Sequence, residues 1–283
     1  KDYAIWQNKM LKSKYIKEQE NYWLDVFSNE VPLLEMPIDY TRPERKSYKG
    51  DRLFFKIDRQ LTEKLNKAAG DNNVTLYMVL LAAYNVLLFK YTAQNDIVIG
   101  MPVAGRPHAD LQNIIGMFIN TLPLRNRIET KVLFSDFLKT VKENLLNAVE
   151  NQDYPLEELV SKLGIKRQKN RNPLFDTAFV LQNMERGELE FEDLKFVPYE
   201  LDNKTSMFDI TMRGIERNGE IDFEFEYSTD LYKEESIKKM VDSYMKILEV
   251  VSEDQSVAIK DIEILEGYKV LEDIEVEDVE FDL

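Results

Sequence analysis

Residues 75 to 91, TLYMVLLAAYNVLLFKY, are the stretch that most limits the folds open to this chain. Thr75 is a residue type that caps helix N-termini, and the residues after it predict a helix that reaches about Tyr91. A surface helix has one polar face, whereas this helix is apolar on nearly every side. We therefore expect it to be buried.

The rest of the chain mixes helical and strand-like patterns. A long apolar and charged segment predicts an amphipathic helix within residues 9–28, and three prolines predict an extended connector over 31–43. Further helices are predicted at 61–69, 134–149, 155–163 and 237–248, and strands near 53–57, 97–99, 174–182, 207–214 and 221–227. Helices and strands joined by long connections imply an α/β (α+β layered) fold with a mixed sheet packed against helices.

Composition excludes several function classes. The 283 residues are 44% hydrophobic, and 37 Lys and Arg against 52 Asp and Glu give a net charge of −15. An acidic surface argues against nucleic acid as a partner. The absence of cysteine removes thiolate chemistry and disulfides, and it fits a reducing compartment. With no signal pattern and no run of 18 apolar residues, we expect a cytoplasmic protein without a membrane partner.

Catalytic candidates are few. The single histidine, His108, lies among turn residues in AGRPHADLQ, and we expect it at the surface rather than in a catalytic role. One histidine and no cysteine exclude an ordinary zinc site, so we predict no metal. No G-x-S-x-G elbow and no glycine-rich phosphate-binding loop is found.

The segment IGMFINTLPLR, residues 115–125, is a strand-like apolar run that carries a polar pair in its middle. A polar side chain inside a buried strand needs a hydrogen-bond partner, because leaving it without one costs about 1–3 kcal/mol. Asn120 and Thr121 therefore require an explanation.

Two further polar clusters follow, NQDYPLEEL at 151–159 and RQKNRNPLFD at 167–176. Taken singly, each of the three clusters has a structural explanation: a strand end with a paired Asn, a helix start built on Asp153 and Pro155, and a basic turn before a strand. Residues alone leave the structural and functional interpretations open.

In order and spacing, the three clusters resemble motifs of the condensation domains of nonribosomal peptide synthetases, which read I/V-G-x-F-V-N-T, H/N-Q-D-Y/V-P-F-E and R-x-x-S-R-N-P-L. The departures are Ile119 for Val, Leu156 for Phe and Asn170 for Ser. The N-terminal KDYAIW resembles another family element, Y-x-D-F/Y-A-V-W, and LEMPIDYTRP and FDITMRGIE also resemble family segments. The resemblance extends over about residues 1–265.

The resemblance implies one lobe of a chloramphenicol-acetyltransferase-like fold. The family's active-site motif, H-H-x-x-x-D-G, lies in an N-terminal lobe, and this sequence has no such motif. The resemblance therefore implies a C-terminal lobe (29–265), preceded by a crossing segment and helix (1–28) and followed by an acidic tail or linker (266–283). Because the catalytic histidine is missing, we expect the chain alone to be inactive.

The implied activity of the intact domain is acyl transfer that forms an amide between an aminoacyl or peptidyl thioester donor and an aminoacyl acceptor. Donor and acceptor carrier proteins would supply both substrates on phosphopantetheine arms, so we predict no directly bound cofactor. The other expected partners are the N-terminal lobe and adjacent synthetase domains. The alternatives are a non-catalytic carrier-protein docking module and a lobe of an epimerisation or heterocyclisation domain.

The resemblance also assigns roles to residues. It places Gly116, Phe118, Asn120 and Thr121 at the substrate tunnel, with Asn120 as either a tunnel-lining group or a structural hydrogen-bonding group. The residues implied to be structural, near the site, are Gln152, Asp153, Arg167, Arg171 and Asn172. In the tail, apolar residues alternate with acids, and we expect it to be held as an added strand or against a basic surface.

Overall fold

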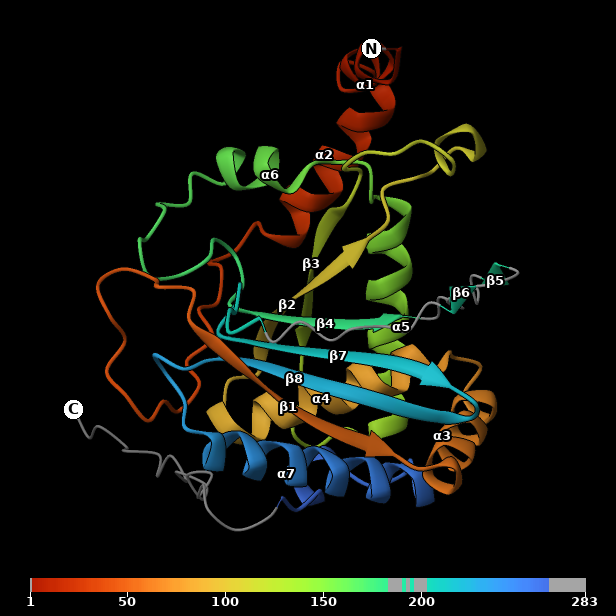
Figure 1. Ribbon diagram of the computed structural model, residues 1–283, viewed down its shortest axis with the longest axis vertical. Helices are drawn as coiled ribbons and strands as arrows, with labels where there is room; N and C mark the ends of the chain where they lie inside the picture. The colour runs from red at the N-terminus through yellow and green to blue at the C-terminus, as the bar shows by residue number, and fades with distance from the viewer. Residues whose placement is uncertain (1, 183–189, 192–193, 196–202, 265–283) are drawn as a thin grey trace, which may run out of the picture.

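The computed structural model describes residues 2–182, 190–191, 194–195 and 203–264. A six-stranded mixed sheet organises this part of the chain, in the order β1-β8-β7-β4-β2-β3 (Figure 1). The β1/β8, β8/β7 and β2/β3 pairs are antiparallel, whereas β7/β4 and β4/β2 are parallel. The strands are Gly50–Ile57 (β1), Asp96–Val103 (β2), Asn120–Arg127 (β3), Thr177–Gln182 (β4), Ile210–Arg217 (β7) and Glu220–Ser228 (β8). The short strands Glu190–Phe191 (β5) and Leu194–Lys195 (β6) form a separate pair.

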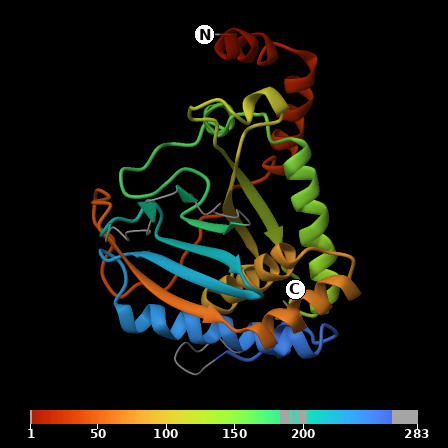
Figure 2. The same cartoon turned by 45° about the vertical axis from the view of Figure 1, so that its right-hand side comes forward.

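Helices cover one face of this sheet and extend beyond its end. They are Asp2–Met10 (α1), Lys14–Val26 (α2), Arg59–Asp71 (α3), Leu76–Thr92 (α4), Phe134–Glu150 (α5), Leu156–Lys162 (α6) and Glu234–Glu253 (α7), with 3₁₀ turns at Ala109–Leu111 (η1) and Ile259–Asp261 (η2). In both views α1 and α2 form an arm at one end of the molecule, beside the loop that joins β2 to β3 (Figures 1 and 2).

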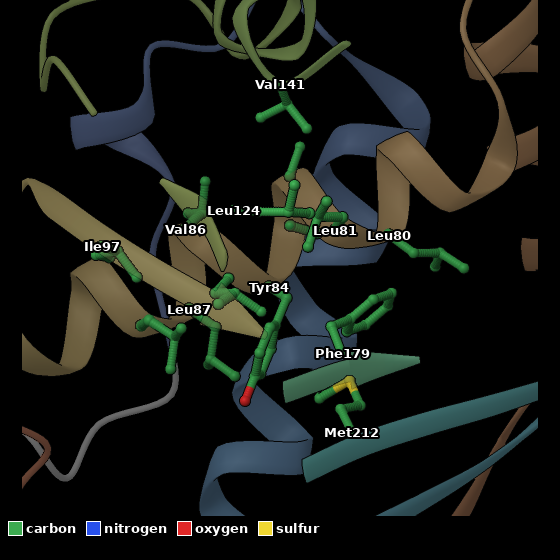
Figure 3. Close-up of a cluster of buried hydrophobic side chains, with 14 of the residues drawn as sticks. Leu80, Leu81, Tyr84, Val86, Leu87, Ile97, Leu124, Val141, Phe179 and Met212 are labelled. Carbon is green, nitrogen blue, oxygen red and sulfur yellow. The ribbon is translucent and has the colours of Figure 1, made fainter. Parts of the chain in front are cut away.

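The apolar helix α4 is buried as predicted. Thr75 caps it by accepting a hydrogen bond from the Met78 N–H at 3.3 Å, and Leu76 and residues 78–91 are buried. Figure 3 shows Tyr84 of α4 beside Phe179 of β4, and the centroids of their two rings lie 5.4 Å apart. The Tyr84 hydroxyl lies 2.5 Å from the Thr177 hydroxyl, which satisfies two polar groups inside the core.

The predicted alternation in β8 also holds. Ile221, Phe223, Phe225 and Tyr227 are buried, and the Phe223 ring lies 6.1 Å from the Tyr244 ring of α7. The acids between them lie on the other face, where Arg52 and Arg213 both approach Glu224, at 3.2 and 2.9 Å. This period-2 pattern separates an apolar core face from a charged face.

Four boundary predictions were wrong. The strands predicted near 174–182 and 207–214 begin only at Thr177 and Ile210. The segment predicted as one helix within 9–28 is two helices, because the chain turns after Met10 and the Ser13 side chain caps α2 by accepting from the Ile16 N–H. The strand-like run beginning at residue 115 becomes a strand only at Asn120. The acidic tail at 266–283, with its predicted added strand, lies outside the described residues.

Among the described residues, no individual helix meets the length and hydropathy needed to cross a membrane. Only α3 and α4 taken together do, and they are bent by 100°.

Candidate functional site

The first motif begins in an exposed loop. Three apolar residues of the motif, and Ile114 directly before it, are exposed to solvent. Their relative exposures are 43% for Ile114, 102% for Ile115, 85% for Met117 and 61% for Ile119. The expected buried strand is therefore absent here, since these side chains point away from the core. Gly116 is exposed and Phe118 is half-buried.

This loop, residues 104–119, is nevertheless held in a defined shape. Gly105 has a φ of +61°, and a Cβ at this position would lie 1.7 Å from the Phe118 carbonyl oxygen, so only glycine fits. The Arg106 guanidinium lies 4.2 Å from the centroid of the Phe118 ring, and its Nη1 donates to the Leu111 carbonyl. The ring of Tyr3 in the arm contacts the same phenylalanine at 4.7 Å.

Asn120 is the residue that joins the first motif to the second. Its Nδ2 donates to the carbonyls of Gln152 at 2.8 Å and Tyr154 at 2.9 Å. Its Oδ1 accepts from the N–H of Thr121 at 2.9 Å and of Leu156 at 3.4 Å. The amide thus satisfies backbone groups at the start of β3 and in the segment 151–156, which we call the junction turn.

The junction turn connects α5 to α6 and contains most of the second motif. Helix α2 faces it: the Trp23 indole donates to the Asn151 carbonyl at 2.9 Å, and the Tyr15 hydroxyl donates to the Asp153 carboxylate at 2.8 Å. Burial raises the pKa of Tyr15, and the Asp153 carboxylate raises it further. Asp153 does not cap α6, because the N-cap position is Pro155.

Arg125, which ends the IGMFINTLPLR segment, bonds to the other end of α2. Its Nε and Nη2 donate to the two carboxylate oxygens of Asp96, at 2.9 and 2.7 Å. The same guanidinium donates to the carbonyls of Val26 at 3.0 Å and Glu30 at 2.8 Å. The arginine that ends this segment is thus explained by the last turn of α2, whose carbonyls lack helical partners, and by the chain just beyond it.

The third motif lies apart from the other two, in a cluster of buried charges. Arg171 donates to Asp176 and to the Leu34 carbonyl, each at 3.0 Å, and the Asn172 N–H donates to Asp176 at 2.9 Å. The Asn172 side chain donates to the Met207 carbonyl at 3.2 Å. Arg167, by contrast, is exposed.

Three residues that the sequence analysis did not identify complete this cluster of charges, namely Arg42, Lys46 and Asp209. Asp209, which is 4% exposed, accepts from Arg42 at 3.1 Å, and the Lys46 Nζ lies 4.0 Å from it. Burial raises the pKa of Asp176, and the negative charge of Asp209 raises it further. Burial lowers the pKa of Lys46, although Asp209 partly offsets this effect. A sequence signal did exist, because Asp176 and Asp209 both follow a phenylalanine directly before paired parallel strands.

A strained turn ends the third motif. Leu174 is buried with a φ of +71°, and the Phe175 N–H donates to the Pro173 carbonyl at 3.0 Å, which defines a γ-turn. The turn places the Phe175 ring against Gly100 of β2, where a Cβ would lie 2.3 Å from the ring. Strain of this kind persists only where surrounding contacts enforce it.

The single histidine lies at the surface as expected. The side chain of His108 is 66% exposed and accepts from the Asp110 N–H at 3.3 Å. Among the described residues, no three acidic or histidine side chains come together as a metal site.

Comparison with known proteins matches this chain to one family along most of its length. The sequence profile of the Condensation domain family matches residues 1–269. Tyrocidine synthase 3 from Brevibacillus parabrevis is 46% identical over 265 residues, which cover 94% of this chain and 4% of that protein. The chain therefore spans a small fraction of the length of this relative.

Two solved structures share the fold. One is a four-domain nonribosomal peptide synthetase bound to AMP and glycine, with a TM-score of 0.83 and 25% identity; the match covers 89% of this chain and 20% of that one. The other is the X-domain from teicoplanin biosynthesis in complex with OxyB, with a TM-score of 0.85 and 23% identity; here the coverage is 93% and 60%. Profile, relative and fold agree, and the chain belongs to the condensation domain family of nonribosomal peptide synthetases.

Proposed function

We propose that this chain is the C-terminal lobe of a condensation domain that joins two carrier-bound substrates through an amide bond. In this proposal residues 1–28 form the crossing segment, 29–265 the lobe and 266–283 a tail or linker. The acceptor amine attacks the thioester carbonyl of the donor, and a C–N bond forms. The C–S bond breaks and releases the donor's phosphopantetheine thiol, which takes up the proton that the amine loses. Carrier proteins would bring both substrates on phosphopantetheine arms.

The exposed apolar surface of the 104–119 loop is the observation that carries this assignment. Monomeric proteins rarely expose contiguous apolar side chains on an ordered loop unless another surface covers them. Ile115, Met117 and Ile119 lie in the family motif itself, beside the arm. An N-terminal lobe that covers them would leave Gly116 and Phe118 at the boundary between lobes, where the substrate tunnel is proposed.

The hydrogen bonds divide the residues of the proposed tunnel into those that hold the backbone and those that line the tunnel. Both amide atoms of Asn120 bond to backbone groups, so its proposed contribution is to hold the junction turn beside the tunnel. The residues proposed to line the tunnel are Gly116, Phe118 and Thr121. Gln152 and Asp153 are proposed to support this side of the tunnel. Arg171 and Asn172 are proposed to hold the segments that contain Leu34 and Met207.

A carrier-protein docking module is the second candidate. It is favoured by the X-domain, which has the same fold and was solved bound to a partner protein. Binding without turnover would characterise such a module. The two candidates therefore differ in whether an intact domain makes amide.

The test uses an intact domain that contains this lobe, loaded donor and acceptor carrier proteins, and mass spectrometry of the dipeptidyl thioester. We expect product from the intact domain and none from this chain alone, because a positioned base contributes about 10²- to 10⁴-fold in rate. Chiral analysis of the product separates condensation from epimerisation. Carrier binding without product in the intact domain would instead establish the docking module.

A further inference from the structure

One face of α2, within the arm (residues 2–26), bonds to the junction turn. Tyr15, Gln19 and Trp23 are spaced by four residues, so they share one face of the helix. All three donate to or accept from the junction turn or its flanking residues. The turn is therefore one place where the direction of the arm is set, in addition to the Arg125 bond to the Val26 carbonyl at the other end of α2.

Gln19 is the centre of this face and is only 2% exposed. Its Oε1 accepts from the N–H groups of Asp153 at 3.1 Å and Tyr154 at 3.0 Å, and its Nε2 lies 3.5 Å from the Glu150 carbonyl that accepts from it. A buried glutamine whose amide satisfies adjacent backbone groups costs little to bury and fixes their position.

Asn120 holds the same turn from the opposite side. It donates to the carbonyls of Gln152 and Tyr154, whereas Gln19 accepts from the N–H groups of Asp153 and Tyr154. One amide comes from the arm and the other from the first residue of β3. Because hydrogen bonds are directional, two amides on opposite sides of one turn restrict both its position and its tilt.

We propose that Gln19 and Asn120 are positioning residues that fix the direction of the arm relative to the sheet. The consequence for catalysis rests on the proposed function: in an intact condensation domain, the arm would carry this direction to the N-terminal lobe and align the two lobes. Neither residue needs to contact substrate for this role. In this proposal Gln19 acts as a hydrogen-bond acceptor and Asn120 as a hydrogen-bond donor. Substitutions that keep or remove only one of these functions can therefore test it, as well as substitutions that remove the whole amide.

The test measures the distance between the arm and the sheet. The sequence has no cysteine, so Lys9→Cys on α1 and Lys139→Cys on α5, both exposed, give two unique sites for nitroxide labels. In the otherwise unchanged chain, double electron–electron resonance should give a single narrow distance peak. Gln19→Met and Asn120→Leu, which preserve size and remove the hydrogen bonds, should each broaden or shift that peak.

Gln94 supplies a matched control within the body. It accepts from the Glu35 N–H at 2.7 Å and donates to the Leu33 carbonyl at 2.8 Å, so it too holds two backbone groups, but it has no contact with the arm. Gln94→Met should leave the peak narrow. Equal broadening in this control would show that general loosening, and not the arm contact, moves the labels.

Conservative substitutions give the second test. Gln19→Glu keeps an oxygen that accepts the two N–H groups and should retain the narrow peak, whereas Asn120→Asp loses both donors and should broaden it. If Gln19→Met does not fold, as judged by its melting curve, this contrast decides alone. A narrow peak in Asn120→Asp, identical to that of the otherwise unchanged chain, overturns the proposal. These distances need no substrate, so absence of amide formation in the intact domain would overturn only the proposed function.

Discussion

At the scale of single residues, the polar side chains of the first two motifs act mainly on the backbone. Asn120 bonds to four backbone groups, and Arg125 bonds to two carbonyls as well as to Asp96. Sequence reasoning identified Asn120 as needing a partner, but it could not find that partner 32 residues away. The partner depends on how α5 returns the chain to β3, which is a property of the whole fold.

Arg125 offers a test of this backbone role. Arg125→Lys should lower the free energy of unfolding by about 1–3 kcal/mol, because an ammonium cannot reproduce the paired bonds to Asp96 and the carbonyl contacts. Arg127→Lys is the matched control: its side chain is 60% exposed and contacts the same Asp96 at 3.2 Å, so the expected change is below about 0.5 kcal/mol. Urea unfolding measures both.

The same pair predicts a pH dependence. Burial raises the pKa of Asp96, but the bonds and charge of Arg125, with Arg127, outweigh this and leave the pKa below its ordinary value. A lowered pKa in the folded state contributes stability above the unfolded pKa, and that contribution is lost as pH falls through the folded value. The difference between wild type and Arg125→Lys should therefore shrink on acidification. A difference that stays constant would contradict the assignment of this stability to the ion pair.

At the scale of elements, local patterns predicted much of the fold. The helices α4, α5 and α7 and the strand β8 follow their apolar periodicities, and Thr75 caps α4 as expected. The predicted start of β3 was wrong because the apolar residues of the preceding loop have a strand-like sequence although they are exposed. The buried pair of Arg42 and Asp209 was missed because its members are 167 residues apart.

The 104–119 loop can be tested as an element. Gly105→Ala forces a Cβ toward the Phe118 carbonyl and should open the loop, so limited proteolysis within 106–119 should accelerate while the core stays folded. Gly70→Ala is the control: nothing lies within 4 Å of its added Cβ, and in a helix it should be neutral or stabilising by about 0.5–1 kcal/mol. Equal protease sensitivity in both variants would show that Gly105 does not shape the loop.

At the scale of the whole molecule, the apolar loop surface has no covering partner among the described residues, and the proposed function assigns it to contact between lobes. Ile115 is fully exposed, so Ile115→Ser should change the unfolding free energy of this chain by less than about 0.5 kcal/mol. In an intact domain the same change would remove apolar contact between lobes. Turnover should fall while stability of the isolated chain is unchanged.

Phe54→Ser provides the comparison for that prediction. Phe54 is 62% exposed on β1, at the opposite edge of the sheet from β3, so it is a large apolar side chain outside the proposed contact. It should leave dipeptidyl thioester formation unchanged, whereas Ile115→Ser should reduce it. Turnover that is undiminished in both variants would show that the exposed loop does not take part in the reaction. A fall in both would point to a general loss of apolar surface, and only the selective loss at Ile115 supports contact between the lobes at the 104–119 loop.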